Sequence, residues 1–267
     1  MAVIGFIGTG NMGGALALAA GRNTEGDQIL LCDRDKQKAM RISHGIPKSR
    51  VTELEELVDL SNYIFIGVKP QMLAALFDEL GPALRKRLEY PVLVSMVAGV
   101  AIAKIREYSG IEGPVVRIMP NLPVSVGAGL VMVARDDLTR DEDYSDVLRI
   151  LKPAGEIAPI EERLIDAGAS ISGCGPAFAA MFIEALADGG CAAGLPRETA
   201  ALLASQTLFG TAVLMMKNRM YPGILKDMVC SPGGTTIEGV RVLEENGMRG
   251  AVMDAVIAAY EKALKLG

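Results

Sequence analysis

Short apolar segments alternate with helix-forming segments through the first 160 residues, and this alternation constrains the fold more than any other feature. The helix-forming segments include Asn11–Ala20 and Asp35–Ile42. The predicted strands are Val3–Ile7, Gln28–Cys32, Tyr63–Gly67, Val92–Ser95, Val115–Met119, Leu130–Val133 and Ile157–Ile160. Apolar strands of four or five residues between helices predict a parallel sheet with helices on both faces.

The pattern changes near Glu161, after which no convincing strand follows. Helices are predicted to begin at Pro176, Pro196, Thr235 and Arg249, and Gly194 would end the first of them. Thr235 and Glu238 have the spacing of a capping box. The sequence therefore predicts an α/β domain over residues 1–160 and an all-helical domain over residues 161–267.

Charge and composition exclude several classes of function. The chain has 27 Lys and Arg against 32 Asp and Glu, and the net charge of −5 argues against a nucleic-acid partner. The four cysteines are far apart and form no CxxC pair, so neither a zinc site nor a disulfide framework is expected, and the thiols fit a reducing cytoplasm. His44 is the only histidine and lies in a polar, turn-like stretch, so Ser-His-Asp and multi-histidine metal chemistry are set aside.

Two features of the chain bear on membranes and assembly. The N-terminus enters a strand directly, without a signal-like segment. Residues 199–216 carry no charge, which reaches the lower limit of a membrane span, but polar residues interrupt the segment and charges flank it closely. We therefore expect no membrane partner and a helix buried at a subunit or domain core. The apolar composition of the helical half predicts an obligate homo-oligomer.

A glycine-rich turn follows the first predicted strand and opens the first helix. It reads Gly8-Thr9-Gly10-Asn11-Met12-Gly13. In this position Gly8 permits the tight turn, Gly10 lets the backbone approach a pyrophosphate, and Gly13 lets the helix pack on the strand. The helix N-terminus attracts the anion. The motif predicts a dinucleotide-binding site.

The second strand ends in Asp33-Arg34, and these two residues predict opposite cofactors. Asp33 lies 20 residues after Gly13, where a carboxylate accepts hydrogen bonds from the adenosine ribose and favours NADH. Arg34 could hold a 2′-phosphate and would favour NADPH. The sequence leaves the choice open.

A second loop, Ser231-Pro232-Gly233-Gly234-Thr235-Thr236, combines two glycines and three hydroxyls just ahead of a helix. Free backbone N–H groups and the positive end of the helix make it a candidate site for a substrate carboxylate. Glu184 and Asp188 lie four residues apart on an apolar helix. They could form a proton-transfer pair, although a polar stripe or an interface explains them more simply.

Taken together, these segments resemble pyrroline-5-carboxylate reductase over nearly the whole chain. The matching segments are residues 8–14, Val68-Lys69-Pro70, Ala98-Gly99-Val100, Met119-Pro120-Asn121, Gly173–Phe178, Glu184–Gly190 and Asp227–Thr236. The last one, DMVCSPGGTT, is the most specific.

The resemblance implies a Rossmann domain followed by a helical dimerisation domain. Members of this family reduce the cyclic imine 1-pyrroline-5-carboxylate to L-proline with NADPH or NADH. Their dimers interlock through the C-terminal helices, some stack into decamers, and the active site lies between the cofactor domain of one chain and helices of its partner.

Carried over by residue, the resemblance places Ser231, Gly234 and Thr235 near the substrate carboxylate and the Thr236 hydroxyl near the imine nitrogen. It places Val68, Lys69, Pro70, Ala98 and Asn121 along the cofactor groove. The chemistry agrees, because hydride transfer to an imine that arrives protonated needs a positioned hydroxyl rather than a strong acid.

The chain departs from the family pattern at a few positions. Leu122 replaces a threonine, Cys174 a serine and Phe178 a tyrosine, and Arg219 precedes Tyr221-Pro222 where an acidic residue and His-Pro are common. These changes spare both glycine loops. Two alternatives remain: another imine or β-hydroxyacid reductase of the same architecture, or a non-catalytic NAD(P)-binding paralogue. The predicted long helix from Pro176 lacks the lysine of β-hydroxyacid enzymes.

Overall fold

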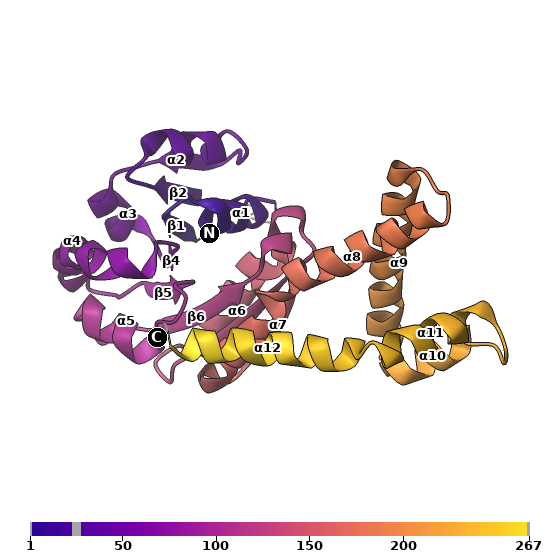
Figure 1. Ribbon diagram of the computed structural model, residues 1–267. Coiled ribbons are helices and arrows are strands. Elements are labelled where there is room, and N and C mark those ends of the chain that lie inside the picture. Colours follow the sequence, from indigo (N-terminus) through magenta and orange to yellow (C-terminus); the bar gives the residue numbers. More distant parts are fainter. Residues whose placement is uncertain (1, 23–27, 266–267) are drawn as a thin grey trace. The chain divides into compact units, whose positions relative to one another are not determined.

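The computed structural model describes residues 2–22 and 28–265 (Figure 1). Internal contacts divide the chain into two compact units, residues 1–173 with 260–267 and residues 174–259. The predicted domain boundary at 160/161 lies 13 residues before this division (173 − 160), and it stays a prediction.

Within the described residues, eight strands form one sheet in the order β3-β2-β1-β4-β5-β6-β7-β8. Their bounds are β1 (Val3–Ile7), β2 (Gln28–Cys32), β3 (Ser49–Val51), β4 (Tyr63–Ile66), β5 (Val92–Ser95), β6 (Val115–Pro120), β7 (Gly129–Arg135) and β8 (Gly155–Pro159). The edge strand β3 was not predicted, because Ser49-Arg50-Val51 carries no apolar run.

The prediction of an all-parallel sheet holds for β1 to β6 and is wrong for the last two strands. β7 pairs with β6 in antiparallel fashion, and β8 is parallel to β7. Only residues 121–128 connect β6 to β7. A parallel crossover needs a dozen or more residues, so this short connection reverses the chain direction.

Helices cover both faces of the sheet and create two hydrophobic cores (Figure 1). Successive strand side chains alternate between the cores, as Phe6 and Ile7 do. Phe6 stacks on Phe65 with ring centroids 4.6 Å apart. One face carries α1 (Asn11–Ala20), α2 (Lys36–Ser43) and α6 (Asp141–Leu151), and the other carries α3 (Leu54–Leu60), α4 (Leu73–Lys86) and α5 (Ile102–Ser109). This doubly covered sheet is the Rossmann-like domain that the sequence predicts.

No strand follows Pro159 in the described part of the chain, as predicted. The helices are α7 (Ile165–Ser172), α8 (Gly175–Ala192), α9 (Arg197–Asn218), α10 (Pro222–Val229), α11 (Thr235–Glu245) and α12 (Met248–Leu264). α8 and α9 pack through Ala187, Ala200 and Ala204. Asp188 pairs with Arg197 at 2.5 Å on their exposed surface, so the structure supports the polar-stripe interpretation of Asp188.

Large apolar side chains remain exposed on the C-terminal helices of the single chain. Met181 is 68% exposed, Leu202 67% and Phe209 61%. Residues 162–192 and 197–218 are long and apolar enough to cross a membrane, judged by length and composition alone. Because its own chain leaves α9 mostly exposed, the predicted burial of this helix requires a surface outside the chain.

Candidate functional site

The glycine-rich turn between β1 and α1 is held by close backbone approaches. Gly8 has φ +88°, and a Cβ added to Gly13 would lie 2.0 Å from the carbonyl oxygen of Gly8. A Cβ on Gly67, at the end of β4, would lie 3.0 Å from the same oxygen. Gly10 differs, since a Cβ there meets nothing within 4 Å. Gly8, Gly13 and Gly67 therefore shape the turn, while Gly10 leaves an open backbone surface that fits a pyrophosphate.

The first turn of α1 offers donors to an anion. Gly10 is the N-cap and has no side chain to accept hydrogen bonds from the N–H groups of Asn11, Met12 and Gly13. Thr9 is buried, at 4% exposure. The carboxylate of Asp33 accepts hydrogen bonds from the Thr9 backbone N–H at 2.7 Å and from its hydroxyl at 3.1 Å. The end of β2 thus braces the glycine turn.

A pocket of about 580 Å³ lies where β1, β2 and β4 end. Ligands of open α/β sheets bind beyond the carboxyl ends of the strands, which favours this pocket over one of about 360 Å³ near the starts of β4 and β5. Six predicted cofactor residues line it: Gly8, Gly10, Asp33, Arg34, Val68 and Lys69. The structure therefore brings together the glycine turn, the end of β2 and the segment after β4.

Oppositely charged pairs line this pocket. Arg34 lies 3.4 Å from Glu79, Lys38 lies 3.9 Å from Asp35, and Lys36 pairs with Glu53. Burial, followed by the negative charge of Glu53, raises the pKa of the Cys32 thiol to about 11. Sequence reasoning missed Lys36, Lys38, Glu53 and Glu79, because charged residues on exposed helix surfaces carry no distinguishing pattern.

Seven predicted cofactor residues lie outside the pocket lining. Four of them, Thr9, Asn11, Met12 and Gly13, belong to the glycine turn and the first turn of α1, and the other three lie farther along the chain. Pro70 begins a 3₁₀ turn, Pro70–Met72, and Ala98 is exposed after β5. Asn121 follows β6, and its side chain donates to the Ser172 carbonyl at 3.0 Å and accepts from the Leu130 N–H at 2.8 Å. The structure gives Asn121 a bracing role, and the contact of all three with a cofactor stays a prediction.

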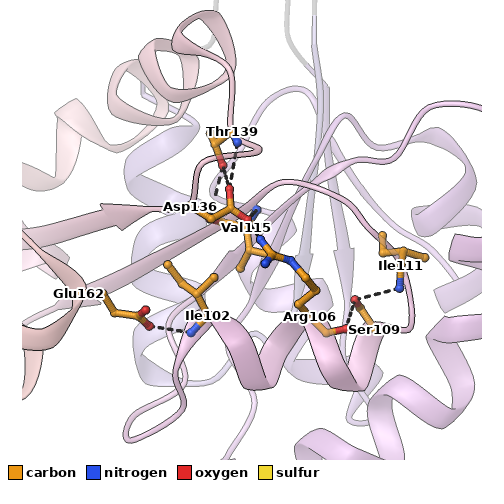
Figure 2. Close-up of polar contacts among 8 residues, drawn as sticks. All are labelled: Ile102, Arg106, Ser109, Ile111, Val115, Asp136, Thr139 and Glu162. Carbon is orange, nitrogen blue, oxygen red and sulfur yellow. Dashed lines mark hydrogen bonds and ion pairs between the residues drawn. The ribbon is translucent and has the colours of Figure 1, made fainter.

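Polar contacts anchor α5, the helix that follows Ala98. Glu162 accepts a hydrogen bond from the Ile102 N–H at 2.6 Å, at the start of the helix (Figure 2). Toward the other end, the Asp136 carboxylate pairs with Arg106 and accepts from the Val115 N–H at 3.1 Å (Figure 2). Glu162 therefore fixes the helix that follows the predicted cofactor segment.

The Ser231–Thr236 loop forms a tight turn at the start of α11. Gly233 has φ +66°, and the Gly234 N–H donates to the Ser231 carbonyl at 3.0 Å. Ser231, Thr235 and Thr236 are exposed. The predicted capping box is wrong, because Gly234 is the N-cap and Glu238 instead pairs with Arg241 at 3.1 Å. Without a side-chain cap, the first N–H groups of α11 stay available to an anion.

The departures from the family pattern fall at distinct places. Leu122 is 66% exposed, and Cys174 and Phe178 are half-buried. Arg219 ends α9 with φ +48° and is the one non-glycine residue with positive φ in the described part of the chain. His44 is exposed at the end of α2, consistent with its surface interpretation.

Comparison with known proteins identifies the family. The family model described as pyrroline-5-carboxylate reductase dimerisation matches residues 162–266, and one described as NADP oxidoreductase coenzyme F420-dependent matches residues 3–99. The pyrroline-5-carboxylate reductase of Escherichia coli (strain K12) is 39% identical over 98% of this chain and 97% of its own length. This chain belongs to the pyrroline-5-carboxylate reductase family.

Solved structures agree with this assignment. The Plasmodium falciparum pyrroline carboxylate reductase, solved with NADP bound, is 32% identical and has a TM-score of 0.84, covering 98% of this chain and 97% of that one. The Coxiella burnetii pyrroline-5-carboxylate reductase is 28% identical with a TM-score of 0.91, covering 100% and 98%. The predicted Rossmann domain, helical dimerisation domain and nicotinamide cofactor are therefore confirmed.

Proposed function

We propose that this chain reduces the C=N bond of 1-pyrroline-5-carboxylate to give L-proline, the last step of proline biosynthesis. Its full-length similarity to reductases of this substrate carries the proposal. The exposed, uncapped Ser231–Thr236 turn supports it, because a carboxylate-bearing substrate needs an anion site separate from the cofactor phosphates.

The glycine turn, the first turn of α1 and the end of β2 would hold the dinucleotide. The open backbone at Gly10 and the uncapped N–H groups of α1 suit its phosphates. Val68 and Lys69 line the same pocket. When bound, the reduced nicotinamide supplies the hydride.

The SPGGTT loop would bind and orient the imine. Ser231, Gly233, Gly234 and Thr235 offer hydroxyl and N–H donors for the carboxylate, and the Thr236 hydroxyl would hold or relay the proton at the imine nitrogen. Since a cyclic imine can arrive already protonated, a weakly acidic hydroxyl is sufficient.

The assembly belongs to the same proposal. Two chains would join through the C-terminal helices, whose large apolar side chains their own chain leaves exposed, and dimers could stack into decamers. The boundary would lie at 160/161, close to residue 162 where the dimerisation match begins. We place the protein in the cytoplasm and assign it neither a membrane nor a nucleic-acid partner.

The deciding experiment follows oxidation of the reduced nicotinamide in the presence of 1-pyrroline-5-carboxylate. We expect imine-dependent oxidation, a large loss of kcat in Thr236→Ala, and recovery in Thr236→Ser, which restores the hydroxyl. Gly234→Val should raise the KM for the imine, because even a Cβ there lies 2.3 Å from the Ser231 hydroxyl. Gly239→Ala, on the same helix with nothing within 4 Å of its Cβ, is the matched control.

Other outcomes would support the alternatives. Wild-type kinetics in both Thr236→Ala and Gly234→Val would overturn the site assignment. Loss of activity in Asp188→Asn while Thr236→Ala stays active would indicate a different imine reductase. Tight cofactor binding without turnover of any imine would indicate a non-catalytic paralogue.

A further inference from the structure

The Asp33 carboxylate occupies a fixed position in the cofactor pocket. One oxygen accepts hydrogen bonds from the Thr9 N–H at 2.7 Å and from the Thr9 hydroxyl at 3.1 Å. The other oxygen accepts from the Asp35 N–H at 2.9 Å. Three donors on two segments therefore hold a negative charge at the end of β2, beside the glycine turn.

Three of the cations that line this pocket, Arg34, Lys36 and Lys38, are exposed and already paired. The Arg34 side chain is 65% exposed and lies 3.4 Å from Glu79, which comes from α4. Lys36 pairs with Glu53, and Lys38 lies 3.9 Å from Asp35. Each cation would have to leave a carboxylate before it could neutralise an added phosphate. Hydrogen bonds thus hold the negative charge of Asp33 in place, whereas these three cations are held only by exposed ion pairs.

We propose that Asp33 makes this protein select a nicotinamide dinucleotide with a free ribose 2′-hydroxyl, NADH, over the 2′-phosphorylated NADPH. The inference rests on the proposed function, since it concerns the cofactor of that reductase. A fixed carboxylate at the end of the second strand accepts hydrogen bonds from a ribose hydroxyl and repels a 2′-phosphate. The braced position of Asp33 keeps it from turning away from such a phosphate.

In the competing assignment, Arg34 determines whether NADH or NADPH is preferred. If Arg34 held a 2′-phosphate, the chain would prefer NADPH, and loss of the guanidinium would weaken NADPH binding alone. The pairing of Arg34 with Glu79 and its high exposure argue against that role. Arg34 and Asp33 can therefore be separated by binding measurements.

The test is isothermal titration of the full-length protein with NAD⁺ and NADP⁺, without imine. We expect the Kd for NADP⁺ to exceed that for NAD⁺ by roughly tenfold or more, the effect of one close, unscreened like charge. Asp33→Asn, which removes the charge at nearly constant shape, should lower this ratio by roughly tenfold. Asp35→Asn removes a carboxylate of the same pocket that already pairs with Lys38, and it should leave the ratio within about threefold. Arg34→Gln should also leave it within about threefold.

Two results would overturn the proposal: wild-type protein that binds NADP⁺ at least as tightly as NAD⁺, or an Asp33→Asn ratio equal to that of the wild type. If circular dichroism shows that Asp33→Asn is unfolded, the ratios of the two Kd values in the wild type and in Arg34→Gln test the proposal by themselves. Because no imine is present in the titration, a ratio of Kd values that contradicts this inference does not contradict the proposed reductase activity. If the protein shows the expected ratio of the two Kd values but does not turn over the imine, the proposed function is contradicted and the role of Asp33 stands.

Discussion

The guanidinium of Arg117 on β6 lies 2.8 Å from the carboxylate of Asp166 on α7, and the Arg117 side chain is only 4% exposed. Glu162 provides a second carboxylate at 3.6 Å and also accepts from the Ile102 N–H. The Nε atom of Arg117 is buried and has no hydrogen-bond partner. One buried cation thus joins β6 to α7 and, through Glu162, to α5.

We predict unequal losses of stability for removing the two partners of this pair. Asp166→Ala leaves the buried guanidinium with Glu162 alone, at 3.6 Å instead of 2.8 Å, and should lower the free energy of unfolding by about 2–3 kcal/mol. Arg117→Met removes the buried charge and its unpaired Nε, while the more exposed Asp166 and Glu162 return to water, so it should cost less than about 1 kcal/mol. Urea denaturation at fixed protein concentration measures both.

The exposed pair Arg163–Glu161 is the control for Arg117. Its side chains are 71% and 66% exposed at 2.8 Å, so Arg163→Met should change stability by less than about 0.5 kcal/mol. A larger loss in Arg117→Met than in Asp166→Ala would contradict the asymmetry.

Substitutions in the glycine turn between β1 and α1 should distinguish glycines that stabilise the fold from glycines that bind the cofactor. Gly13→Ala places a Cβ 2.0 Å from the Gly8 carbonyl and should destabilise the fold by about 1–3 kcal/mol. Gly10→Ala meets no atom within 4 Å and should cost at most about 1 kcal/mol, yet raise the Kd for the dinucleotide roughly tenfold. Thermal unfolding and NAD⁺ titration measure the two effects. Equal loss of stability in both variants would show that Gly10 is also structural.

The sequence predicted those elements correctly in which the local residue pattern and the packing of the domain favour the same structure. Val3–Ile7 and Asn11–Ala20 have the predicted bounds, because a fully apolar run and a helix opened by glycine leave few alternatives. The direction of β7 could have been inferred from the short connection of residues 121–128, which does not allow a parallel crossover. β3 could not be predicted, since Ser49-Arg50-Val51 carries no apolar run and its place depends on β2 beside it. The false capping box at Thr235 shows the same limit, because the N-cap is Gly234, whose role depends on the turn before it.

The backbone turn of the candidate site could be predicted from the sequence, whereas most of the ion pairs around it could not. The glycine turn and Asp33 carry a spacing that their chemistry requires, and the structure places them together. Glu79 and Glu53 come from α4 and from just before α3, and no spacing connects them to Arg34 and Lys36. The conflict between Asp33 and Arg34 could therefore be argued only after the hydrogen bonds of Asp33 and the partner of Arg34 were known.

Arg219 provides a prediction of increased stability. It ends α9 at φ +48° and ψ +41°, a left-handed conformation that costs a residue with a Cβ roughly 1 kcal/mol. The next residue, Met220, donates to the Met215 carbonyl at 3.0 Å, which is the bonding of a helix end that favours glycine. Arg219→Gly should therefore raise the free energy of unfolding by about 0.5–1 kcal/mol. Lys217→Gly, inside the last turn of α9, should lower it by about 1 kcal/mol, and a loss in both variants would contradict the argument.

Cys32 gives the stability of the cofactor-free protein a dependence on alkaline pH. Burial, and then Glu53, raise the pKa of its thiol from 9.0 to about 11. The thiol of the unfolded chain therefore ionises first, so its stabilising contribution is complete below about pH 9 and is lost as the pH rises toward 11. With allowance for partial exposure of the thiol, the loss should be about 1 kcal/mol. Urea denaturation of wild type and Cys32→Ala at pH 8 and pH 10.5 isolates this contribution, because every other alkaline group is common to both proteins. The wild type should lose more stability than the variant over this interval, and equal losses would show that Cys32 titrates as an ordinary thiol.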